Sequence, residues 1–234
     1  MSVKYHELVS CPDQKTPFDP AQEDWKKTDQ GMETCELIGR LFHPQDVVRL
    51  CVTGAASNIH TETTVCAIEG KAENMQSSLG DLPGILTALA GRWTEELSVS
   101  LRVNPVGGNA ERTGYPNAAI VIEGMDAADY KRLVMLIHTL RLPVTAILCG
   151  QRTVMFVRVN ASDKAEYDSR ARLLIGEMKG VDPEMEWTVK DPEETVPIPR
   201  IAKDGLFYSI YYPACGTPPV DEWSQKFFKT VVNK

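Results

Sequence analysis

The sequence predicts an α+β domain, and three observations in residues 118–161 lead to that prediction. A short apolar segment predicts a strand at 118–123, and an amphipathic segment predicts a helix from 127 to about 140. Two further apolar segments, at 144–149 and 153–159, are separated only by Gly150-Gln151-Arg152 and therefore predict a hairpin. Strands and helices in this order around a hairpin are typical of a ferredoxin-like or RRM-like sandwich.

Capping residues set the expected ends of these helices. Asp126 is a good N-cap for the first helix, with Asp129 three residues further on. Pro143 precedes the strand at 144–149, where it can no longer interrupt a helix. Ser162 is expected to cap a second helix that buries Leu174 and Met178.

The flanking sequence predicts an N-terminal α/β extension to this core. Residues 1–31 are polar and read as an arm, and residues 32–234 as a single domain with its core at about 95–200. Within that domain, helices are expected near 33–42, 82–93 and 221–231, and strands near 47–52, 63–68, 97–103 and 207–212.

The composition is that of an ordinary globular protein and argues against a membrane-spanning protein, a zinc protein and a nonspecific DNA-binding protein. The N-terminus has no apolar signal region and no run approaches 18 apolar residues, so a cytoplasmic protein without a membrane span is expected. Six cysteines without CxxC spacing predict reduced thiols rather than a zinc site. The net charge of −7 argues against nonspecific DNA binding by the whole surface. Six acids against one lysine at 182–194 predict a solvated loop or, less readily, a functional acidic tract.

Four segments share their order with one known family. They are 98–106 (SVSLRVNPV), 121–125 (VIEGM), 149–155 (CGQRTVM) and 157–161 (VRVNA). Together they resemble the archaeo-eukaryotic primase superfamily, in particular the primase-polymerase domains of phages and plasmids. The resemblance covers roughly 95–200 and implies a ferredoxin/RRM-like primase core with a nucleotidyl-transfer site.

The resemblance also implies roles for individual residues. The catalytic acids would be Glu123, Asp126 and Asp182, with Glu123 as the ligand of Mg²⁺ or Mn²⁺. The set expected to bind nucleotide is Gly150, Arg152, Thr153 and Arg200.

Two methionines depart from the family pattern. Two-metal phosphoryl transfer needs several carboxylates around both ions, and residues two apart on a strand point the same way. Residue 125 would be the second acid but is a methionine, whose thioether does not suit a hard cation. The family's hairpin histidine corresponds to Met155. Asp126 is adjacent, but its reading as a helix cap is preferred.

Three functional hypotheses follow from these residues. The first is a primase-like replication protein of a phage or mobile element, catalytically degenerate, that binds nucleic acid, nucleotide or a replication partner. The second is an active, divergent primase-polymerase that uses Glu123, Asp126 and Asp182 with Mg²⁺ or Mn²⁺. The third is an assembly or inhibitor subunit that does not bind nucleic acid. The expected partners are single-stranded DNA, NTP or dNTP and a replicative helicase, with no membrane.

Overall fold

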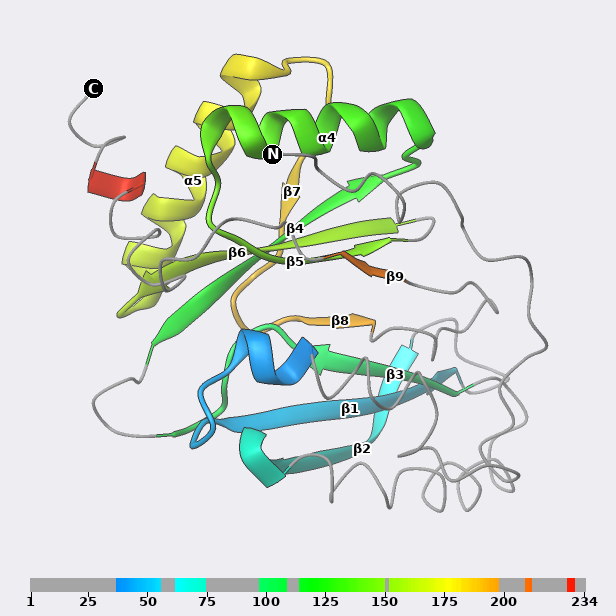
Figure 1. The fold of residues 1–234 in the computed structure, drawn as a ribbon. Helices are drawn as coiled ribbons and strands as arrows, with labels where there is room; N and C mark the ends of the chain where they lie inside the picture. The colour runs from blue at the N-terminus through cyan, green and yellow to red at the C-terminus, as the bar shows by residue number, and fades with distance from the viewer. Residues whose placement is uncertain are drawn as a thin grey trace.

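Two antiparallel sheets build the described part of the chain (Figure 1). The computed structural model describes residues 37–55, 62–74, 97–108, 114–149, 152–197, 209–211 and 227–229. A four-stranded sheet has the order β2-β1-β3-β8, and a five-stranded sheet has the order β7-β4-β6-β5-β9. The α+β class expected from the sequence is confirmed.

The five-stranded sheet contains a complete β-α-β-β-α-β unit. Its elements in chain order are β4 (Tyr115–Glu123), α4 (Ala127–Leu140), β5 (Val144–Cys149), β6 (Arg152–Ala161), α5 (Lys164–Val181) and β7 (Thr188–Val189). β4 and β6 are the central antiparallel pair, with β7 beside β4 and β5 beside β6. This is the ferredoxin-like strand order. β9 (Ser209–Tyr211) adds a fifth strand at the β5 edge and lies within the strand that the sequence predicts near 207–212.

Helices α4 and α5 cover one face of this sheet (Figure 1). Every second residue of β4 and β6 points into the apolar core beneath them, as strand geometry requires. The core includes Ile120, Met155, Leu133, Leu174 and Met178, each fully buried. Burial of this amphipathic face explains why both helices form where the sequence predicts them.

The opposite face of the five-stranded sheet is also covered. Val121, Val154 and Phe156 point to this side and are at most 4% exposed. The helical turn at 37–41 lies against it, and the Leu41 carbonyl accepts hydrogen bonds from the Asn117 side chain and the Arg158 guanidinium. A strand of nucleic acid therefore cannot lie flat on this sheet as it does on the open sheet of an RRM.

The four-stranded sheet forms the N-terminal extension. It contains β1 (Val47–Ala55), β2 (Glu62–Lys71), β3 (Leu97–Arg102) and β8 (Thr195–Pro197), and the 3-10 turn η3 (Ala72–Asn74) follows β2. β8 reaches this sheet from beyond the ferredoxin-like unit, so residues 190–194 connect the two sheets. In the described part of the chain, no helix has the length and apolarity needed to cross a membrane.

The local predictions differ from the structure at a few positions. Asp163, not Ser162, caps α5: its carboxylate accepts the Glu166 amide, and Ser162 instead donates to the Glu166 side chain. The expected strand at 118–123 begins earlier, at Tyr115, because its first residue pairs with Ala161 of β6. The arm at 1–31 and the helix expected at 82–93 lie outside the described residues.

Candidate functional site

Glu123 lies at the end of β4 and forms an ion pair across the sheet. The register places Glu123 opposite Arg152, the first residue of β6, and its Oε1 atom lies 2.6 Å from Nε of Arg152. The two side chains are 61% and 48% exposed. The acid and the cation that the resemblance assigns to metal and nucleotide thus contact each other.

The chain turns away from the strand directly after Glu123. Gly124 has a φ of +64°, a left-handed conformation that glycine adopts without strain. Met125 then packs against the core beneath the helices instead of extending beside Glu123. The thioether therefore has an apolar packing role, and residue 125 does not extend the line of the strand.

Asp126 caps helix α4, as the sequence predicts. Its Oδ1 atom accepts the amides of Ala128 and Asp129 at 2.7 and 2.8 Å. The Asp129 carboxylate accepts the Asp126 amide in return at 3.3 Å, which completes a capping box. The local helix end accounts for the position of this carboxylate without a metal ion.

Asp182 lies at the C-terminal end of α5 and is bound by Arg132 of α4. Its Oδ1 atom accepts a hydrogen bond of 2.6 Å from Nη2 of Arg132, and the residue is only 9% exposed. Arg132 also contacts Asp129 at 3.3 Å and Glu184 at 3.6 Å. The hydrogen bond to Asp182, followed by the charges of these acids, raises the pKa of Arg132 above its ordinary value. Arg132 therefore ties α4 to the end of α5.

Two residues near the start of β6, Thr153 and Met155, are buried, whereas Arg152 is exposed. The Thr153 hydroxyl lies 3.0 Å from the Tyr130 hydroxyl of α4, and Thr153 is completely buried. Met155 is also completely buried and belongs to the apolar core. Gly150 and Arg200, which complete the expected nucleotide-binding set, lie outside the described residues.

A hollow of about 260 Å³ lies between the end of β4, the start of α4 and the segment leading into β7. Its charged lining residues are Glu123, Asp129, Arg132, Glu184 and Glu186. Four carboxylates against one guanidinium give it a negative lining, which favours a cation over a phosphate. Within the described ranges, no three His, Cys, Asp or Glu side chains are close enough together to hold a metal ion.

The sequence predicts Glu123, Asp126 and Asp182 in one site, but of these three acids only Glu123 lines the hollow. Glu123 and Arg132 line the same hollow, while Asp182 reaches it through its bond to Arg132. Arg132 was not predicted as a site residue. Its spacing of three residues from Asp129 on an amphipathic helix was a signal for an ion pair.

Comparisons with known proteins give one distant structural likeness. No protein-family model matches the chain, and no curated protein matches it. A solved structure described as the catalytic domain of primase RepB′ in complex with initiator DNA is 12% identical, with a TM-score of 0.44. The likeness covers 86% of this chain and 96% of the primase domain.

Proposed function

We propose that this chain is a primase-like replication protein of a phage or mobile element whose nucleotidyl-transfer site is degenerate. It acts by binding single-stranded DNA, nucleotide or a replication partner such as a helicase. The order of the four motif segments and the ferredoxin-like unit support the primase-like part of this proposal. The contacts of the three expected acids support the degenerate part.

The observation that carries the proposal is the state of those acids. Two-metal transfer needs carboxylates that are free to approach two ions about 4 Å apart. Glu123 is paired with Arg152, Asp182 is bound by Arg132, and Asp126 accepts two backbone amides. Each carboxylate therefore has a bond to lose before it can bind Mg²⁺ or Mn²⁺.

One observation favours the active enzyme as a second candidate. The hollow beside Glu123 has a surplus of carboxylates, from Asp129, Glu184 and Glu186. Hard divalent cations prefer such oxygen ligands. In that case Glu123 would release Arg152 and bind the ion, and Arg152 would turn to the nucleotide phosphates.

Nucleotide incorporation separates the two candidates. The full chain is given a single-stranded template and labelled nucleotides with Mg²⁺ or Mn²⁺. The proposal predicts no incorporation with either metal. Metal-dependent incorporation that is lost in Glu123→Ala would overturn it in favour of the active enzyme.

The chain contains a matched control for this variant. Glu69 of β2 pairs with Arg49 of β1 across neighbouring strands, at 2.5 Å and with similar exposure. Glu69→Ala therefore removes the same kind of surface ion pair from the other sheet. An effect shared by both variants reports on stability, whereas an effect of Glu123→Ala alone reports on the site.

DNA binding tests the remaining part of the proposal. Fluorescence anisotropy with a labelled oligo-dT is measured from low to physiological salt. We expect binding that weakens steeply with salt, because neutralised phosphates release counterions. We also expect Arg152→Gln to weaken it more than Arg49→Gln. Absence of binding at low salt would remove the proposal and favour an assembly or inhibitor subunit.

A further inference from the structure

A second hollow, of about 410 Å³, lies at the other end of β4. The end of β3, residues 105–108, the start of β4 and the start of α5 line it. Tyr115 opens β4 at this hollow and Glu123 ends the same strand, so the two sites are roughly 26 Å apart at the rise of a β-strand. This hollow is therefore separate from the candidate site described above.

Two cations, Arg102 and Lys164, and two acids, Asp163 and Glu193, line this hollow. The Asp163 carboxylate already accepts the Glu166 amide as the N-cap of α5. Arg102 ends β3, and its side chain is only 15% exposed. Its Nε atom is buried and has no hydrogen-bond partner among the described residues. Buried donors are rarely left unpaired, so this atom indicates a missing acceptor. Lys164 opens the 18-residue helix α5, whose N-terminal end adds a partial positive charge.

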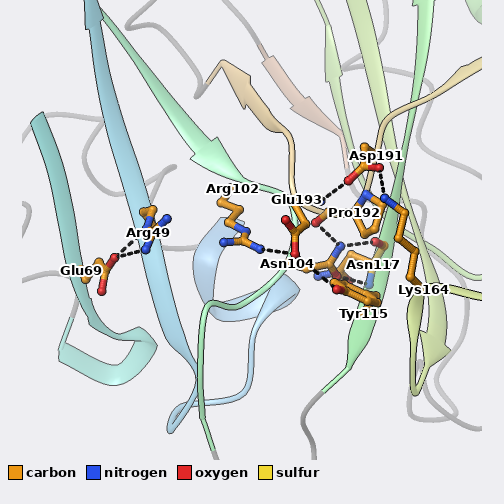
Figure 2. Close-up of polar contacts among 10 residues, drawn as sticks. All are labelled: Arg49, Glu69, Arg102, Asn104, Tyr115, Asn117, Lys164, Asp191, Pro192 and Glu193. Atoms are coloured by element: carbon orange, nitrogen blue, oxygen red, sulfur yellow. Dashed lines mark hydrogen bonds and ion pairs between the residues drawn. The ribbon is translucent and has the colours of Figure 1, made fainter. Parts of the chain in front are cut away.

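An acidic strap, residues 191–193, pairs with both cations (Figure 2). Asp191 contacts Lys164 at 2.5 Å, and Glu193 contacts Arg102 at 3.3 Å. The Tyr115 hydroxyl donates to the same Glu193 oxygen at 3.4 Å. Both distances to Glu193 are long, and this carboxylate is 60% exposed, so it can leave without the loss of a short bond.

We propose that this hollow binds a phosphate ester and that the Glu193 carboxylate occupies the phosphate position in the unliganded chain. A phosphate has the three acceptor oxygens that the Arg102 fork, Lys164 and the Tyr115 hydroxyl require. In the bound state, Glu193 turns to solvent and the Nε atom of Arg102 gains its missing acceptor. The inference concerns a different site and stands without the function proposed above.

The rest of the lining fits the organic part of a nucleotide. Pro105 and Val106 supply apolar lining, and Tyr115 lines the same hollow. Gly114 lets the chain at the start of β4 lie close to the end of β6, because a Cβ atom at this position would collide with the Ala161 carbonyl. The volume lies within the range of small-molecule sites.

Calorimetric titration of the full chain with inorganic pyrophosphate in EDTA tests the proposal. EDTA keeps divalent metals out, so the acidic hollow beside Glu123 does not contribute. We expect binding that weakens about tenfold or more in Arg102→Gln, since a charged hydrogen bond is lost. Lys164→Gln, at an exposed helix start, is expected to weaken pyrophosphate binding as well. It replaces Arg102→Gln as the test variant if Arg102→Gln does not fold. No binding by the unaltered chain or by Glu193→Gln would overturn the proposal.

The acidic strap provides the most discriminating variants. Glu193→Gln removes the competing carboxylate, so pyrophosphate should bind severalfold more tightly than to the unaltered chain. Arg49 and Glu69 form an ion pair between β1 and β2 (Figure 2) and do not line the hollow, so Glu69→Gln and Arg49→Gln should leave binding unchanged. Equal weakening by Arg49→Gln and Arg102→Gln, or weaker binding by Glu193→Gln, would contradict the assigned site.

Two further probes distinguish the sources of the phosphate. dATP and an oligo-dT of ten nucleotides are titrated in the same buffer against the same variants. If Arg102→Gln weakens the binding of dATP alone, the ligand of the hollow is a free nucleotide. If it weakens the binding of the oligonucleotide, the ligand is a DNA strand. Either result supports the site, whereas binding of both probes that ignores Arg102 and Glu193 would contradict it.

Discussion

Asn104 and Asn117 exchange two hydrogen bonds where the two sheets meet. The Asn117 amide donates to Oδ1 of Asn104 at 2.8 Å, and Nδ2 of Asn104 donates to the Asn117 carbonyl at 2.9 Å. The same Nδ2 atom also donates to the Pro192 carbonyl at 3.1 Å. Both asparagines are completely buried. The asparagine of the Asn-Pro turn thus joins the end of β3, the start of β4 and the acidic strap.

Asn104→Ala is therefore expected to lower the free energy of unfolding by about 3 kcal/mol, because three buried bonds are lost together. Asn117→Ala is the matched control. It removes the side-chain bonds to the Leu41 and Val103 carbonyls but keeps the backbone bonds to Asn104, so about 1–2 kcal/mol is expected. Urea denaturation measures both. A smaller loss in Asn104→Ala than in Asn117→Ala would show that the side chain does not join the sheets.

Asp126 can be tested as a cap and as an acid separately. Asp126→Ala should lower the free energy of unfolding by about 1 kcal/mol, the usual contribution of an N-cap. Asp126→Asn should restore it, because asparagine caps equally well. Thermal unfolding gives the stability, and nucleotide incorporation is measured on the same samples. Loss of incorporation in a stable Asp126→Asn would assign a metal-binding role to this carboxylate.

Introducing the histidine that the primase superfamily has at the position of Met155 should not create a nucleotide site. Met155 is fully buried in the core, so Met155→His places a polar ring where it has no partner. We expect a loss of about 2–4 kcal/mol in unfolding free energy and no gain of nucleotide binding. Met155→Leu conserves the volume and should cost less than about 1.5 kcal/mol. A stable Met155→His that binds dATP would place this side chain at the nucleotide after all.

Acid should weaken the start of α5 through Glu166. The Ser162 amide and then the Ser162 hydroxyl donate to its carboxylate, and with the nearby Arg170 they lower the pKa of Glu166. A lowered pKa stabilises the fold above the ordinary glutamate value of about 4.3, and this stabilisation is lost as the pH falls through the folded-state pKa. Thermal unfolding should show Glu166→Gln less stable than the unaltered chain at pH 7, with the difference vanishing in acid. A difference that is unchanged at pH 3 would contradict this account.

The sequence predicted best those elements whose signals are local. The cap at Asp126, the apolar face of α4 and the glycine between β5 and β6 act within a few residues, and the structure confirms the helix and both strands. β7 and β8 were missed because each is only two or three residues long and exists through pairing with β4 and β3. No periodic pattern can develop over so short a segment.

The same division holds for the candidate site. The position of Glu123 at a strand end follows from the sequence alone, and pairing with a nearby arginine is common there. That Arg132 binds Asp182 could not be predicted, because the bond depends on how the ends of two helices meet. The packing of the helical turn at 37–41 against the second face of the sheet could not be predicted either, because this turn comes from a distant part of the chain.

The return of β8 to the first sheet has a consequence for how the chain folds during synthesis. Ser100 of β3 pairs with Pro197 of β8, about a hundred residues later. As the protein leaves the ribosome, β3 therefore keeps one edge unpaired until the entire ferredoxin-like unit has emerged. Such long-range pairing slows folding, and an open strand edge invites pairing with other chains in the meantime. A product truncated before residue 195 would keep this edge permanently and would be prone to aggregate.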